Sequence, residues 1–164
     1  MYELSVNLLC LLEVISIECP RVLLGGNGGT QGSALSLGRL AEVLAFVLTL
    51  TTAGKGAALF NDTLAQRAPQ LSKISRTGIL GPVTSILVTL HMAARHFKSA
   101  ETPAEALATS RGDAILPCIE YLQGLSANTS SMSTNPEHVH RTELIGLHAA
   151  VQASLDLNAI QSEK

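Results

Sequence analysis

The chain has 164 residues, of which 46% are hydrophobic, 3% aromatic and 15% charged, and its formal net charge is −2. This length suits one domain that buries a sizeable core of Leu, Ala, Val and Ile. A nucleic-acid-binding role is not indicated, because there is no basic stripe and there are too few aromatic rings for base stacking. The three cysteines (Cys10, Cys19 and Cys118) show no CxxC spacing, so we expect free thiols in a cytoplasmic protein.

The first element is ambiguous between helix and strand. Residues 1–19 are apolar, but they contain Glu3 and Glu13 and lack a basic leading region, which argues against a signal peptide. Leucines follow helical spacing at first, and β-branched residues then favour a short buried strand at about residues 12–18. Pro20 interrupts either element.

The rest of the chain predicts helices joined by polar or glycine-containing segments. "ETPAEAL" predicts a capping box with Thr102 as N-cap and Glu105 at the third helical position. Pro82 is expected in the first turn of its helix, and Asn135 is expected to cap the last helix after a polar loop at 126–135. The helices are expected at about residues 35–52, 57–67, 82–98, 103–109, 114–125 and 136–160. The fold class is therefore mainly α, a single compact domain over residues 1–164 with at most one short N-terminal strand.

Residues 77–94 form the longest stretch without Asp, Glu, Lys or Arg. The stretch is just long enough to cross a bilayer. It also contains Gly78, Gly81, Pro82 and His91, which favour a buried helix of a soluble protein, so we expect no membrane span.

A glycine-rich loop, "GGNGGTQGS", stands directly before a predicted helix. Backbone N–H groups of such a loop can approach an anion, and a helix N-terminus adds partial positive charge. No Gly-Lys-Ser/Thr closes the loop, and Gly32 comes one place too late for a G-x-G-x-x-G fingerprint. Two interpretations stay open: a flexible corner, or an anion site formed by Gly25, Gly26, Asn27, Gly28, Gly29 and Thr30.

"ISIECPRVLLGGNGGT" and the two helices after it resemble the C-terminal catalytic segment of hydroxymethylglutaryl-CoA reductases over residues 12–73. The resemblance implies that the loop binds a phosphate of coenzyme A or NADPH. It also implies no activity for this chain alone, because the family's catalytic histidine would fall at about Ala68 and its Lys, Asp and Glu lie upstream. The chain would then be a partial or degenerate relative of an oxidoreductase.

No other residues converge on a catalytic or metal site. His91 and His96 are five residues apart and do not share a helix face, and His138, His140 and His148 lack the H-E-x-x-H spacing of a zinc site. The alternative function is a noncatalytic helical interaction module, which the low charge and Ala/Leu-rich composition favour. Under either hypothesis we expect a homo-oligomer or a protein partner.

Overall fold

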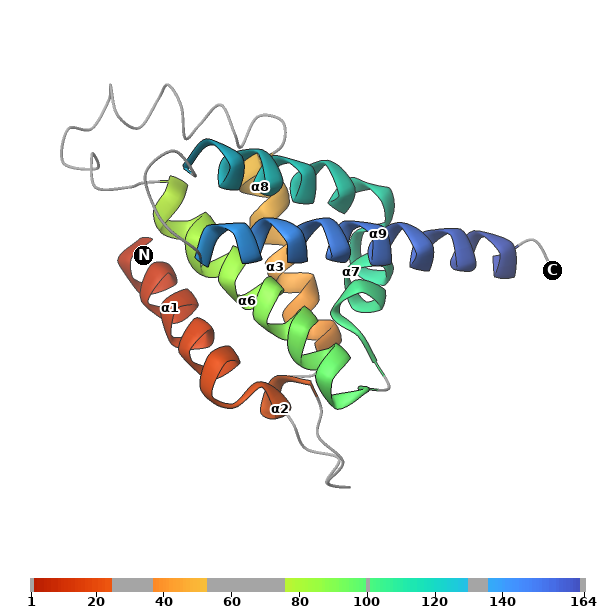
Figure 1. The fold of residues 1–164 in the computed structure, drawn as a ribbon, viewed down its shortest axis with the longest axis horizontal. Helices are drawn as coiled ribbons and strands as arrows, with labels where there is room; N and C mark the ends of the chain where they lie inside the picture. The colour runs from red at the N-terminus through yellow and green to blue at the C-terminus, as the bar shows by residue number, and fades with distance from the viewer. Residues whose placement is uncertain (1, 25–36, 53–75, 100, 130–135, 163–164) are drawn as a thin grey trace.

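The structure is a computed structural model of the chain, and it describes residues 2–24, 37–52, 76–99, 101–129 and 136–162 (Figure 1). All regular elements in these ranges are helical, which confirms the mainly α prediction. They are α1 (Tyr2–Glu18), α2 (Pro20–Leu23), α3 (Leu37–Thr52), α6 (Arg76–Phe97), α7 (Pro103–Arg111), the 3₁₀ turn η3 (Gly112–Ile115), α8 (Leu116–Thr129) and α9 (Pro136–Ser162).

The strand expected at residues 12–18 is wrong, because these residues complete α1. Val14 and Ile17 are exposed and lie beside no strand in the described part of the chain. β-branched side chains lower helix propensity only slightly. Contact between α1 and α6 therefore outweighs their preference for a strand.

Helix α6 lies in the middle of the bundle and contacts α1, α2, α3, α7 and α9 (Figure 1). Its side chains Val83, Ile86, Leu87 and Leu90 are almost fully buried. Stretch Gly78–Phe97 of this helix is, within the described ranges, the one segment long and apolar enough to cross a membrane. More than half of this stretch is buried inside the fold.

The remaining helices pack through small residues at one contact and through larger aliphatic residues at another. Helix α3 packs on α7, where Ala41 and Ala45 on α3 and Ala104 and Ala108 on α7 are buried. Helix α9 packs on α6, α7 and α8 through Leu144, Leu147 and Val151. The last turns of α9 extend beyond the other helices (Figure 1), and Leu157 and Ile160 are exposed there.

Two helix boundaries differ from the sequence prediction. Helix α6 begins at Arg76, so Pro82 lies inside it and not in its first turn. Proline removes one helical hydrogen bond, and the burial of residues directly after it, such as Val83 and Ile86, stabilises the continued helix. Helix α8 continues to Thr129, into the predicted polar loop. Residues 130–135 and the predicted helix at 57–67 lie outside the described residues.

The capping box predicted at α7 is confirmed. The Thr102 hydroxyl oxygen accepts a hydrogen bond from the Glu105 backbone N–H at 3.3 Å, and a Glu105 carboxylate oxygen accepts one from the Thr102 backbone N–H at 2.9 Å. Pro103 occupies the first helical position, where its missing N–H costs nothing.

Candidate interaction surface on helix α1

Helix α1 carries apolar side chains on both its inner and its outer side, although Glu3, Asn7 and Glu18 are also exposed. Its inner side is buried against α6 through Leu9 and Ser16, with Val6 and Leu12 half-buried beside them. The Ser16 hydroxyl donates a hydrogen bond to the Glu13 carbonyl at 2.7 Å, so this buried polar group is satisfied within the helix.

The opposite side of α1 carries large aliphatic side chains in solvent. We call Leu4, Leu8, Leu11 and Val14 the outer face; their exposed fractions are 69%, 56%, 55% and 55%. They are spaced three or four residues apart, and so lie along one side of the helix. A helix on the surface of a bundle ordinarily presents a polar face to water, so a row of large aliphatic side chains in solvent is unusual. This row of exposed aliphatic side chains makes the outer face a candidate interaction surface.

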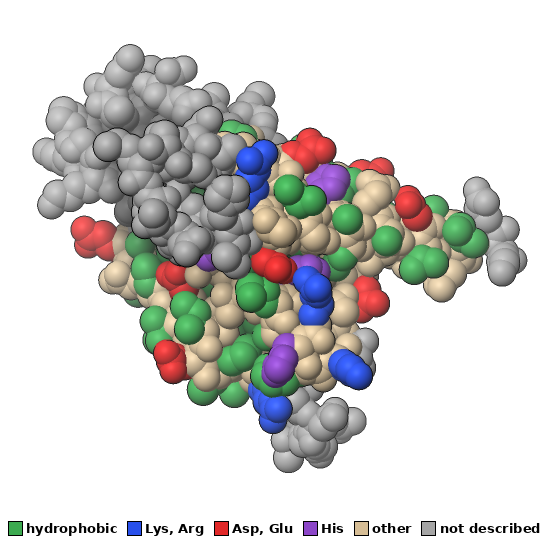
Figure 2. Space-filling model, in the orientation of Figure 1, with side chains coloured by type: hydrophobic (Ala, Val, Ile, Leu, Met, Phe, Trp, Pro, Cys, Tyr) green, Lys and Arg blue, Asp and Glu red, His purple; other side chains and the backbone are tan. Residues whose placement is uncertain are grey.

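The charges on α1 are all negative. The helix contains Glu3, Glu13 and Glu18 and no Lys, Arg or His. The nearest basic residue along the chain is Arg21, whose guanidinium carbon lies 4.4 Å from the ring centroid of Phe97 on α6. Arg21 is thus directed toward the end of α6. Figure 2 shows hydrophobic and acidic side chains over the α1 side of the molecule.

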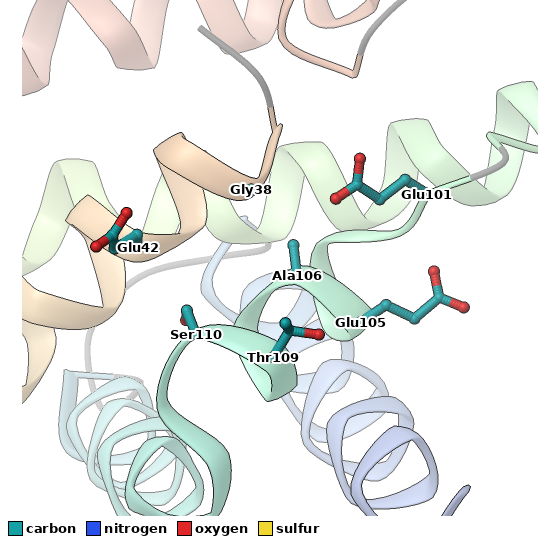
Figure 3. Close-up of a pocket in the computed structure, with 7 residues that line it drawn as sticks. All are labelled: Gly38, Glu42, Glu101, Glu105, Ala106, Thr109 and Ser110. Atoms are coloured by element: carbon teal, nitrogen blue, oxygen red, sulfur yellow. The ribbon is translucent and has the colours of Figure 1, made fainter. Parts of the chain in front are cut away.

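A pocket of about 560 Å³ lies between α3 and α7 (Figure 3). Three glutamates, Glu42, Glu101 and Glu105, line it with Thr109 and other small residues. Glu42 bonds Arg39 at 3.0 Å and Glu105 belongs to the capping box, so two of the carboxylates already serve neighbouring groups. Sequence analysis found Glu105 only as a cap, because residues 42 and 105 meet only in the folded chain.

Two of the histidines, His91 and His148, have described contacts with a neighbouring helix. His91 on α6 is buried, and burial lowers the pKa of its imidazole, opposed by the nearby Glu143 carboxylate and reinforced by Arg95. Arg95 and Glu143 form an ion pair at 3.3 Å that joins α6 to α9.

His148 on α9 approaches α8. Its Nε2 lies 3.4 Å from a Glu120 carboxylate oxygen and forms no hydrogen bond with it. In the described part of the chain no group of three or more His, Cys, Asp or Glu side chains could hold a metal ion.

The three thiols differ in exposure. Cys10 on α1 and Cys19 after it are exposed, whereas Cys118 is buried in α8 and contacts the Ala114 carbonyl oxygen at 3.4 Å. Cys10 therefore provides a natural labelling position at the edge of the outer face.

The predicted anion site falls outside the described residues. The structure does not describe the six residues of the loop, which are Gly25, Gly26, Asn27, Gly28, Gly29 and Thr30. Anion binding by the loop therefore stays a prediction. The outer face of α1 was missed in sequence analysis, although the leucines at positions 4, 8 and 11 already had helical spacing. The misleading signal was the β-branched Val14, Ile15 and Ile17, which we interpreted as a short strand.

A family model described as RNF123-like, TPR repeat matches residues 1–157. No curated protein and no solved structure matches the chain. The match includes all of residues 12–73, so the resemblance to hydroxymethylglutaryl-CoA reductase is wrong, and so are the oxidoreductase and NADP assignments. The expectation of a coenzyme A ligand loses its basis with them. Helices rich in Ala and Leu share the same spacing whatever their family, which explains the misleading similarity. The chain belongs to the RNF123-like TPR repeat family.

Proposed function

We propose that this chain is a noncatalytic protein–protein interaction module and that it binds its partner through the outer face of α1. The observation that carries the proposal is the exposure of Leu4, Leu8, Leu11 and Val14 along one side of a helix whose other side is packed on α6. Fully burying an exposed Leu or Val side chain contributes roughly 1.5–3 kcal/mol. The four side chains are partly exposed, so covering each of them contributes a part of that figure to association.

The physics of helical repeats supports the same function. In TPR and related arrays, each helix pair leaves an apolar face that the next pair buries, and the stacked helices form extended binding surfaces. Helix α1 lies at the edge of the bundle (Figure 1), and the side chains of its outer face are exposed. Another protein, or a second copy of this chain, would cover the face in the way that a neighbouring repeat does.

The experiment compares Leu8→Glu with Leu157→Glu as the matched control. Both leucines lie on helices and are similarly exposed, Leu8 at 56% and Leu157 at 60%. Leu157, however, lies near the C-terminal end of α9, which extends beyond the other helices (Figure 1). Wild-type and variant chains of residues 1–164 are immobilised, and the proteins that they retain from a cell extract are quantified. The proposal requires that Leu8→Glu loses partners that Leu157→Glu retains, with circular dichroism showing the same helix content for all three chains.

A photo-crosslinker attached to Cys10 shows whether the retained protein contacts α1 directly. The label is placed in a Cys19→Ser chain, since Cys10 and Cys19 are both exposed and Cys118 is buried. We expect crosslinks from Cys10 to the same partner that Leu8→Glu loses. Retention of every partner by Leu8→Glu, together with the absence of crosslinks from Cys10, would refute the proposed function.

Sedimentation of the purified chain tests the predicted homo-oligomer separately. A dimer that Leu8→Glu converts to a monomer would make a second copy the occupant of α1. A monomer at every concentration leaves a different protein as the partner.

A further inference from the structure

We infer that the outer face of α1 takes a basic amphipathic helix of a partner protein, with an apolar stripe against Leu4, Leu8, Leu11 and Val14 and with Lys or Arg side chains opposite Glu3 and Glu18. This inference rests on the proposed function and names the chemistry of the partner. Its first support is the shape of the surface. Apolar side chains at intervals of three and four residues form the row that the apolar stripe of another helix packs against.

The second support is the position of the charges. Glu3 precedes the apolar row and Glu18 follows it, four residues beyond Val14 on the same side of the helix. Fifteen residues of helix separate the two glutamates by about 22 Å. Both are exposed, and in the described part of the chain neither forms an ion pair. An apolar row with a carboxylate at each end matches a helix with a basic residue at each end.

The same charges disfavour a second copy of this chain. Two α1 helices packed in parallel would bring Glu3 near Glu3 and Glu18 near Glu18, and packed antiparallel they would bring Glu3 near Glu18. Like charges across an interface suppress association. The exposed apolar end of α9 contains Leu157, Ile160 and Asp156 and no basic residue in its described turns. The α9 end of a second copy would therefore place no positive charge opposite Glu3 or Glu18. A membrane surface rich in anionic lipid would repel the glutamates.

The first experiment measures binding of two synthetic helical peptides to the full chain by fluorescence anisotropy. Each peptide has about 18 residues and the same apolar stripe. One carries lysines about 15 residues apart, opposite Glu3 and Glu18, and the other carries glutamates at these positions. Two exposed charge pairs, attractive in one peptide and repulsive in the other, should make the basic peptide bind about tenfold more tightly at low salt. The preference should shrink in high salt.

The second experiment reverses the charges on the chain. The double variant Glu3→Lys and Glu18→Lys should bind the acidic peptide more tightly than the basic one. The matched control is Glu101→Lys with Glu120→Lys, which changes the net charge equally at exposed positions away from α1. The control should keep the wild-type preference, which separates local pairing from the overall charge of the protein.

The outcomes distinguish this inference from the proposed function. Equal binding of both peptides, lost in Leu8→Glu, would overturn the basic partner and leave the apolar interface standing. Failure of both peptides to bind would overturn the inference. The proposed function would be overturned as well only if Leu8→Glu also left the capture of partners from the extract and the crosslinking from Cys10 unchanged. A dimer broken by Leu8→Glu, or binding to phosphatidylserine vesicles that Leu8→Glu abolishes, would overturn the inference in favour of those occupants.

Discussion

His91 on α6 faces Gly146 on α9, and its imidazole Nε2 lies 3.6 Å from the position that a Cβ atom on residue 146 would occupy. The two helices pack against each other here. His91 is 6% exposed, so a proton on its ring would place a charge inside the bundle. The Glu143 carboxylate of α9 favours the charged form, and Arg95 of α6 disfavours it.

The free energy of unfolding should therefore fall in mildly acidic solution. Burial lowers the His91 pKa in the folded chain from its usual 6.5. Below pH 6.5, His91 is protonated in the unfolded chain but stays neutral in the folded chain. The free energy of unfolding therefore falls as the pH drops from 6.5 toward the folded-state pKa. The loss is at most about 1.4 kcal/mol for each pH unit. Urea unfolding between about pH 7.5 and pH 5.5 measures this loss of stability. The range extends roughly one pH unit to either side of the usual histidine pKa.

The control for this prediction is His91→Gln, which keeps a polar side chain but cannot be protonated. Its free energy of unfolding should change less over the same range than that of the wild-type chain. An unaltered pH dependence in His91→Gln would assign the effect to other groups and contradict the role of His91.

Two leucines on α9 should respond differently to truncation. Leu147 is fully buried, and Leu157 is 60% exposed ten residues later on the same helix. Leu147→Ala should lower the free energy of unfolding by about 2–5 kcal/mol, because it removes buried methyl groups and leaves a cavity. Leu157→Ala should change it by less than about 0.5 kcal/mol. Urea unfolding of both variants gives the comparison, and a large loss in Leu157→Ala would show that the end of α9 is covered.

The fold class was predictable because local patterns determine most of it. The Ala/Leu spacing gives the helices, and Thr102, Pro103 and Glu105 fix the start of α7 through bonds that span only three residues. Residues 12–18 were mispredicted because Val14, Ile15 and Ile17 are β-branched, and periodicity alone cannot assign so short an apolar run to a helix or a strand. The start of α6 was mispredicted at Pro82 because the helix continues on both sides of this proline. The contacts that stabilise it there come from helices far away in the sequence.

The candidate surface was much less predictable than the fold. Leu8 and Leu9 are adjacent and chemically identical, yet Leu9 is buried and Leu8 is exposed. Only the placement of α6 beside α1 determines which of them faces water. The glycine loop attracted a functional hypothesis because its composition stands out, whereas an uncovered apolar face looks in the sequence like part of a core.

Two glycines should respond to alanine in opposite directions. Gly124 lies inside α8 with open space around the position of a Cβ atom, so Gly124→Ala should stabilise the chain by about 1 kcal/mol through helix propensity. Gly112 follows α7 with φ +55°, which L side chains rarely adopt. Gly112→Ala should therefore destabilise the chain by about 1 kcal/mol or more. Thermal unfolding monitored by circular dichroism measures both shifts, and a stabilising Gly112→Ala would contradict the turn described here.

Thr102→Ala should lower the free energy of unfolding by about 1 kcal/mol. The substitution removes the hydroxyl oxygen that accepts from the Glu105 N–H, and this N–H at the start of α7 then has only water as a partner. Thr102→Ser keeps the oxygen and should stay close to the wild-type value, which separates the hydrogen bond from side-chain volume. Because α7 packs on both α3 and α9, the loss should appear in the single cooperative transition and not as separate fraying of α7. Hydrogen exchange of α7 amides checks this: exchange that accelerates in α7 alone would show that the helix unfolds independently of the bundle.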